Sequence, residues 1–199
     1  RLADIDQPGA PDDEVDVADF FVAGGTDIYV QQGEELPKSR VAVLNHFPHM
    51  EGVRLEDGEF RCGALTSFED FGQHPEVRRL VPNMDHYLFL IASLHLRNRA
   101  TLGGNIINAS PIGDMTSLLY ALGSDLVLEK DGSSRRVSME DFFLGYKDLD
   151  MEDGELLTEV VFPDGDAETR VGFEKIAKRK ALDIATVCSG ARLRVEDEQ

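Results

Sequence analysis

Two glycine-rich segments of this chain contain the residue types that bind phosphate groups. They are residues 20–28, FFVAGGTDI, and residues 100–114, ATLGGNIINASPIGD, in a sequence of 199 residues. Glycine lets the backbone turn with a positive φ and lets a ligand come close to it. Successive backbone N–H groups in such turns bind anions. Two separated segments of this kind indicate that a large anionic ligand is bound from both sides.

In the first segment, a short apolar strand ends at Gly24-Gly25. Thr26-Asp27 follows and can cap a helix that begins at Ile28. A helix start after a glycine turn suits a pyrophosphate. An ordinary strand-to-helix turn needs the same residues, so this segment alone leaves both interpretations open. Its spacing matches neither Gly-x-Gly-x-x-Gly nor Gly-x-x-x-x-Gly-Lys, and a nicotinamide-binding Rossmann motif is therefore not indicated.

The second segment is richer in polar groups. Gly103 and Gly104 can present successive N–H groups, and Thr101 can offer its hydroxyl. Asn105 adds a short polar side chain. Asp114 lies at the start of a predicted helix, where a carboxylate serves as an N-cap. The alternative for Asp114 is to accept hydrogen bonds from ribose hydroxyls or another polar ligand group, and the two roles remain open.

The basic residues near these segments are few. Arg97 and Arg99 directly precede the second segment and can meet phosphate, meet the acidic rim of a partner, or lie in solvent. A basic cluster at residues 178–180 is expected on the surface. Lys175 differs, because strand alternation from Phe173 can turn its side chain inward.

Charge and cysteine content exclude several classes of protein. The formal net charge of −18 disfavours nucleic acid and anionic membrane surfaces as partners. The sequence shows no apolar run of about 20 residues and no signal peptide, so we expect a cytoplasmic protein. Two cysteines, Cys62 and Cys188, are too few for an iron–sulfur cluster. The histidines show no zinc pattern, and we expect the aromatic residues Phe142, Phe143 and Tyr146 to be core.

The strands and helices that the sequence predicts around these residues indicate an α+β fold. A small N-terminal βαβ lobe, residues 1–52, has strands at 19–23 and 40–44 with a helix between them. A larger lobe, residues 53–190, carries antiparallel strands and helices. Its expected hairpin and strands are residues 53–62, 125–130, 135–139, 156–162, 170–177 and 185–195. Its expected helices begin at Ser67 and cover residues 84–95 and 115–122, with residues 97–113 as a loop.

In its motifs the chain resembles the FAD-binding subunit or domain of the xanthine dehydrogenase and carbon monoxide dehydrogenase family of molybdenum hydroxylases. The matching segments run in the order of that family and span roughly residues 20–190. They are residues 23–28 (AGGTDI), 91–93 (IAS), 97–105 (RNRATLGGN), 109–114 (ASPIGD), 141–146 (DFFLGY), 155–157 (ELL) and 178–185 (KRKALDIA).

The resemblance implies a vanillyl-alcohol-oxidase-type (PCMH-type) fold, with FAD between the two lobes. It implies neither a catalytic side chain nor a metal ligand in this chain. Residues 21–28 would form the first FAD loop, Ile91 and Leu157 would pack near the flavin, and Lys175 would lie at its polar edge. The cofactor-binding residues implied are Phe21, Val22, Ala23, Gly24, Gly25, Thr26, Asp27, Ile28, Ile91, Thr101, Gly103, Gly104, Asn105, Asp114, Leu157 and Lys175.

The resemblance also implies partners. An iron–sulfur subunit would deliver electrons, a molybdenum cofactor subunit would oxidise the substrate, and NAD or another acceptor would receive the electrons, in a hetero-oligomer. The N-terminal helix usual in the family is not recognisable in residues 1–18, and residues 191–199 would be the start of a C-terminal domain that is absent or truncated. Two alternatives are a docking or assembly module without flavin and a flavin reductase that acts alone on NADH.

Overall fold

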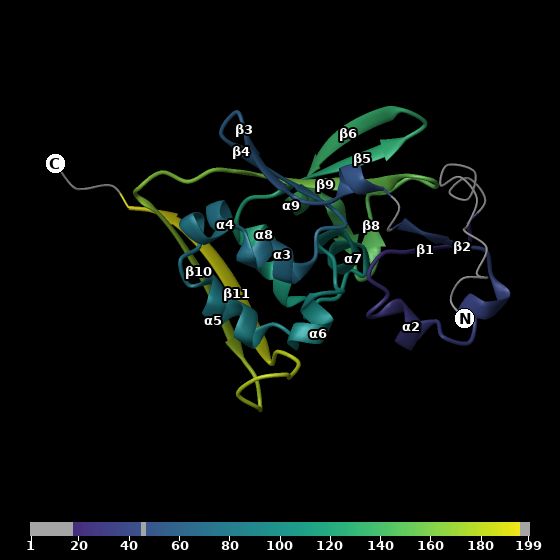
Figure 1. Ribbon diagram of the computed structural model, residues 1–199, viewed down its shortest axis with the longest axis horizontal. Helices are drawn as coiled ribbons and strands as arrows, with labels where there is room; N and C mark the ends of the chain where they lie inside the picture. The colour runs from purple at the N-terminus through teal and green to yellow at the C-terminus, as the bar shows by residue number, and fades with distance from the viewer. Residues whose placement is uncertain (1–17, 45–46, 196–199) are drawn as a thin grey trace, which may run out of the picture.

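The N-terminal lobe is a small parallel β–α–β unit. The computed structural model describes residues 18–44 and 47–195, so the predictions for residues 1–17 lie outside it. Strands β1 (Phe20–Val22) and β2 (Val41–Val43) pair in parallel. The crossover between them carries helix α2 (Ile28–Gln31) and the 3-10 turn η2 (Leu36–Lys38), as Figure 1 shows. The predicted βαβ arrangement is confirmed, with strands shorter than predicted.

A five-stranded antiparallel sheet forms the centre of the larger lobe. Its strand order is β3-β4-β9-β5-β6. Phe60 and Phe162 occupy paired positions on neighbouring strands, and their rings stack with centroids 4.9 Å apart. Both side chains are fully buried, so alternating apolar residues of the sheet form the main core. The strands are β3 (Val53–Glu56), β4 (Glu59–Gly63), β5 (Asp125–Lys130), β6 (Ser133–Ser138) and β9 (Leu156–Pro163).

Short helices cover this sheet and connect it to the rest of the chain. The Ser67 hydroxyl caps α3 by accepting a 3.0 Å hydrogen bond from Asp70 N, as predicted. Gly123, at φ +71°, terminates α8 in the left-handed conformation that glycine favours. The helices are α3 (Phe68–Gln73), α4 (Pro75–Leu80), α5 (Met84–Leu90), α6 (Leu94–Arg97), α7 (Leu102–Ile107), α8 (Asp114–Ala121) and α9 (Met139–Phe142). None of these helices has the length and apolar character of a membrane span.

Two predictions about these helices are wrong. The helix expected over residues 84–95 is divided into α5 and α6 by Ala92, whose φ is +53°. The Arg97 guanidinium donates to the carbonyls of Leu88 (2.8 Å) and Ala92 (3.0 Å), which stabilises the break. The expected loop at 97–113 contains α7, because Thr101 caps a helical turn that the two glycines do not interrupt.

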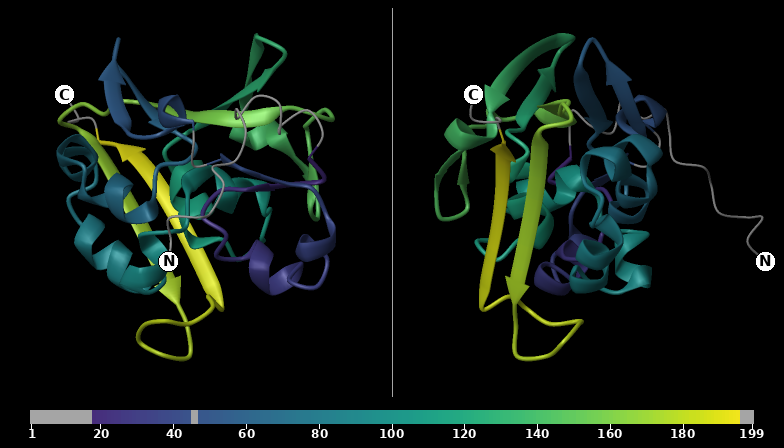
Figure 2. Two further views of the ribbon diagram at one scale, coloured as in Figure 1. Left: turned by 45° about the vertical axis from the view of Figure 1, so that its right-hand side comes forward. Right: turned by 90° about the vertical axis from the view of Figure 1, so that its left-hand side faces the viewer.

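A two-stranded ribbon lies apart from the five-stranded sheet. It consists of β10 (Thr169–Ile176) and β11 (Val187–Arg194), which pair antiparallel. Figure 2 shows the ribbon running alongside the helical layer, where β11 packs against α8. A short antiparallel pair, β7 (Phe143–Gly145) and β8 (Asp148–Leu149), follows directly after α9 in the chain.

The segment that leads into β9 is fixed by an acidic group with a strongly lowered pKa. Glu155 is 8% exposed and makes a double hydrogen bond to the Arg135 guanidinium, at 2.7 and 2.9 Å. Asp150 lies 2.7 Å from the same arginine. The hydrogen bonds from Arg135 lower the pKa of Glu155 to about 2. The ionised form of Glu155 therefore stabilises the folded chain.

Glu155→Gln should destabilise the protein in a pH-dependent way. A carboxyl whose pKa is lowered on folding contributes stability above its unfolded pKa of about 4.3, and this contribution is lost as the pH falls toward 2. We expect a lower melting temperature than wild type at neutral pH and a smaller difference near pH ~3.5. Calorimetry at both pH values measures this. Glu152→Gln is the control, because the Glu152 side chain is 73% exposed; equal effects of the two variants would contradict the account.

Candidate functional site

The two glycine segments lie against each other. A Cβ atom added to Gly24 would be 1.7 Å from the carbonyl oxygen of Arg99, so only glycine permits this approach of two backbones. A Cβ added to Gly104 would lie 4.0 Å from the Ala23 Cβ. Residues separated by 75 positions are thereby brought together at the junction of the lobes. This confirms that the two segments face one region.

The first segment offers unpaired backbone donors. Within residues 18–44 and 47–195, the N–H groups of Gly25, Thr26 and Asp27 donate no hydrogen bond. Gly25 has φ +74°, and a Cβ there would lie 2.5 Å from the Tyr29 ring. Consecutive N–H groups around a residue of positive φ form a concave anion receptor. The predicted loop at residues 21–28 therefore fits a phosphate-bearing cofactor.

Polar side chains close the gap between this loop and the larger lobe. The Asp27 carboxylate accepts a hydrogen bond from Gln31 and does not cap α2. Gln31 also donates to Asn108 Oδ1 at 3.4 Å and accepts from Lys147 Nζ at 3.3 Å. Ile28 is the first residue of α2 and is half-buried. Helix α2 is thus connected to the end of α7 and to the turn after β7.

In the second segment, the backbone N–H groups of residues 102–104 are all hydrogen-bonded. Leu102 N donates to Thr66 O (3.0 Å) and Gly103 N to Ala64 O (2.8 Å). Gly104 N donates to the Thr101 hydroxyl at 3.1 Å. The prediction that Gly103 and Gly104 present N–H groups is therefore wrong, because helix capping and packing use them. Gly103 is needed for packing, since an added Cβ would be 2.7 Å from the Ala64 Cβ.

Asn105 connects α7 to α8. Its side-chain oxygen accepts hydrogen bonds from Thr116 N (3.0 Å) and from the Thr116 hydroxyl (2.8 Å). This interaction sets the position of α8, whose first residue is Asp114. Asn105 therefore positions another candidate residue through its carboxamide.

Asp114 forms a buried ion pair with Lys175. The Lys175 Nζ lies 2.5 Å from Asp114 Oδ2 and 3.0 Å from the carbonyl oxygen of Leu90. The Lys175 side chain is 4% exposed, which confirms that β10 turns it inward. Gly113 is the N-cap residue of α8, so Asp114 is not a cap. Ile91, 2% exposed, adjoins Leu90 and lies in the core beside this pair.

The carboxylate of Asp114 has one oxygen without a partner. Burial raises the pKa of Asp114, and the Lys175 hydrogen bond and charge, with the Cys188 thiol, oppose this. Asp114 Oδ1 is buried and accepts no hydrogen bond from the described residues. A buried unpaired acceptor is unfavourable unless a ligand supplies a donor. The side chain therefore fits a polar group of a cofactor, as the second predicted role requires.

Three apolar candidates belong mainly to the core. Leu157 lies in β9 and is 5% exposed, and Val22 is 3% exposed in β1. Phe21 is partly buried and packs against the main core. Their contacts with the rest of the chain are thus sufficient to explain their residue types.

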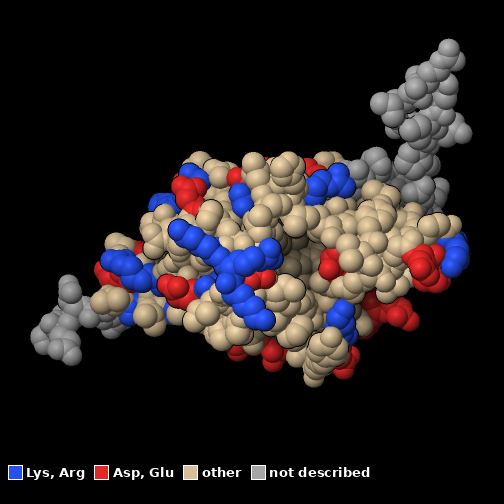
Figure 3. All heavy atoms as spheres, turned by 90° about the horizontal axis from the view of Figure 1, so that it is seen from below, with Lys and Arg blue, Asp and Glu red and all other residues tan. Residues whose placement is uncertain are grey.

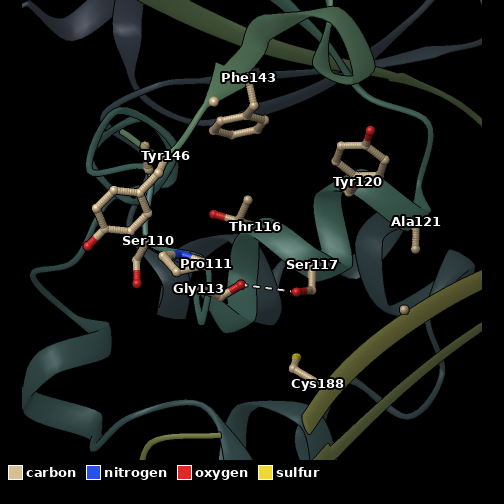
Figure 4. A pocket seen from close by; sticks show the side chains of 13 residues that line it. Ser110, Pro111, Gly113, Thr116, Ser117, Tyr120, Ala121, Phe143, Tyr146 and Cys188 are labelled. Atoms are coloured by element: carbon tan, nitrogen blue, oxygen red, sulfur yellow. Dashed lines mark hydrogen bonds between the residues drawn. The ribbon is translucent and has the colours of Figure 1, made fainter. Parts of the chain in front are cut away.

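A cavity next to Asp114 was not predicted. It has a volume of about 590 Å³ and lies between α8, β7 and β11 (Figure 4). Tyr146, predicted as core, is 80% exposed and lines it together with Phe143, whereas Phe142 is buried. The sequence indicated this cavity only weakly, because polar residues on one face of α8 are the only sequence feature that marks it. The other lining residues are Ala109, Ser110, Pro111, Gly113, Thr116, Ser117, Tyr120, Ala121, Gly145, Cys188 and Gly190.

Comparison with known proteins identifies the family. The family described as "FAD binding domain in molybdopterin dehydrogenase" matches residues 16–165. The FAD-subunit of nicotinate dehydrogenase from Eubacterium barkeri is 32% identical over 186 residues, which cover 92% of this chain and 63% of that protein. The medium chain of carbon monoxide dehydrogenase from Hydrogenophaga pseudoflava is 34% identical over 143 residues, which cover 72% and 50% of the two chains.

Solved structures show the same fold. A structure of carbon monoxide dehydrogenase from Hydrogenophaga pseudoflava superposes with a TM-score of 0.84 at 28% identity, covering 96% of this chain and 68% of that one. The chain belongs to the family of FAD-binding domains of molybdopterin dehydrogenases, and its cofactor is FAD. The predicted fold class is confirmed. The chain spans less than two thirds of the length of the two curated relatives, 63% and 50%.

Lys175→Met should leave Asp114 buried without a counter-charge. Its pKa then rises further, and a carboxyl with a raised pKa loses stability as the pH rises through that pKa. We expect a loss of about 3 kcal/mol in the free energy of unfolding near pH ~8 and a smaller loss near pH ~5. Urea unfolding of the FAD-free chain measures both values.

Lys178→Met is the matched control, because Lys178 is exposed and makes no ion pair within the described residues. A loss in Lys175→Met that is the same at both pH values would contradict the role given to the ion pair.

Proposed function

We propose that this chain is the FAD-binding part of a multi-subunit molybdenum hydroxylase and serves electron transfer. The observation that carries the proposal is the set of N–H groups at residues 25–27, which have no hydrogen-bond partner among the described residues and lie next to the segment around Gly104. When bound, FAD supplies redox chemistry between a reduced iron–sulfur partner and NAD or another acceptor. We also propose that the boundary between the two FAD-binding lobes lies near residue 52.

The backbone and side-chain groups of this site would bind and orient the cofactor. The N–H groups of residues 25–27 would hold the pyrophosphate, with Gly104 leaving space beside it. Asp114 Oδ1 would accept a hydrogen bond from a polar group of the cofactor. Burial raises the pKa of Asp114, and Lys175 fixes that carboxylate while its hydrogen bond and charge oppose the rise. Leu157 and Ile91 would support the site from the core.

The names of the relatives support an assembly. One relative is an "FAD-subunit" and another a "medium chain", names for one subunit among several. We therefore place an iron–sulfur subunit and a molybdenum cofactor subunit beside this chain in a hetero-oligomer. The isolated chain is expected to bind FAD and to oxidise NADH poorly without those partners.

A titration of the purified chain with FAD tests the proposal. We expect a stoichiometric complex with visible flavin absorption. A colourless protein after exposure to FAD would contradict it and support a docking module. Rapid NADH oxidation by the isolated chain would instead support a reductase that acts alone.

Gly104→Val should abolish retention of FAD. A Cβ at this position would be 2.8 Å from the Thr101 hydroxyl and would point toward Ala23 of the first loop. We expect FAD affinity to fall at least ~100-fold, about 2.7 kcal/mol. Gly172→Val is the matched control, because an added Cβ there meets no atom within 4 Å. Full flavin occupancy in folded Gly104→Val, judged by circular dichroism, would sink the assignment of this segment.

A further inference from the structure

We propose that Arg99 is a phosphate-binding residue that neutralises the pyrophosphate of FAD at the junction of the two glycine segments. The inference rests on the proposed FAD site and adds to it a cation at the junction of the two glycine segments. The N–H groups at residues 25–27 are neutral donors. The formal net charge of the chain is −18, so its overall field repels a dinucleotide.

The two arginines that precede the second segment differ in their contacts. Arg97 is 14% exposed on its side chain and pairs with Glu69 at 2.7 Å. Its guanidinium also donates to backbone carbonyls at the end of α5. Arg97 is therefore largely buried, and its Nε and Nη1 groups hold Glu69 and the break between α5 and α6.

Arg99 is exposed and remains available. Its Nη2 donates to the carbonyl oxygen of Gly24 at 3.3 Å, which directs the guanidinium to the first glycine segment. Within the part of the chain that the structure describes, no carboxylate lies within ion-pair distance of Arg99, whereas Arg40, Arg135 and Arg136 are paired. A guanidinium carries five N–H donors, so the bond to Gly24 leaves several unused.

The backbone packing fixes where this cation lies. Gly24 contacts the carbonyl of Arg99 so closely that an added Cβ would be 1.7 Å away. The Arg99 side chain therefore leaves the backbone one residue before Ala100. Its guanidinium forms a hydrogen bond to the loop that carries the N–H groups of residues 25–27. Guanidinium groups bind phosphate through paired, charge-assisted hydrogen bonds.

The molecule is also locally basic on one face. Figure 3 views the molecule from below, on the side of the turn between β10 and β11, and shows Lys and Arg side chains gathered beside a hollow. Lys178 and Lys180 are exposed on that turn. A chain that is acidic as a whole thus carries a positive region on this face.

The test compares Arg99→Gln and Arg99→Lys with Arg170→Gln. Arg170 is a matched control, because it is exposed and its guanidinium donates only to backbone carbonyls, those of Ala167 and Thr169. The probes are FAD, which contains flavin, pyrophosphate and adenosine, ADP, which contains the pyrophosphate and adenosine without the flavin, and riboflavin, which contains the flavin without any phosphate. Calorimetry and fluorescence quenching give the dissociation constants, and circular dichroism checks folding.

We expect Arg99→Gln to weaken FAD and ADP binding about 30-fold and to reduce the salt dependence of both. Riboflavin binding should be unchanged, and Arg99→Lys should keep most of the affinity for FAD. Loss of affinity equal to that of Arg170→Gln, or an equal loss for riboflavin, would overturn the role of Arg99 while FAD binding by the wild type stands. Absence of FAD binding by the wild type would overturn the proposed function itself.

Discussion

The contact of Gly24 with the backbone of Arg99 is the constraint on which the site depends. It is a backbone-to-backbone approach that any side chain at position 24 would block. Through it, a loop of the small parallel unit reaches the turn before α7, which belongs to the larger lobe. The unpaired N–H groups of residues 25–27 owe their position to this contact, because the same loop carries both.

The second constraint is charge. A chain with a net charge of −18 binds an anionic cofactor only if local groups outweigh the overall repulsion. Neutral N–H groups provide directional donors, and the Arg99 guanidinium is hydrogen-bonded to the carbonyl oxygen of Gly24 in the same loop. At the other end of the site, Lys175 compensates the buried charge of Asp114. The unpaired oxygen of Asp114 then remains as an acceptor for a ligand.

The structural features that were predicted correctly from the sequence are those determined by residues close together in the chain. The hairpin at residues 53–62 and the helix start at Ser67 follow from residue types within a few positions of each other, and both are confirmed. The inward position of Lys175 followed from strand alternation. Helix α7 was missed because two consecutive glycines oppose helix formation, whereas the Thr101 cap and hydrogen bonds to the carbonyls of Ala64 and Thr66 stabilise the turn.

The remaining errors have tertiary causes. The division between α5 and α6 depends on hydrogen bonds from Arg97, a residue outside the expected helix. The cavity is lined by α8, β7 and β11, which are distant in sequence, so no local pattern marks it. The donors of the second segment were expected to be free, and helix capping uses them.

Hydrogen–deuterium exchange of backbone amides, with and without FAD, tests the central claim most directly. In the free chain, the amides of residues 25–27 have no hydrogen-bond partner among the described residues and should exchange fast, whereas those of residues 102–104 are bonded and should exchange slowly. The account predicts that FAD strongly protects residues 25–27 and changes residues 102–104 little. Protection of residues 102–104 with no change at residues 25–27 would contradict it.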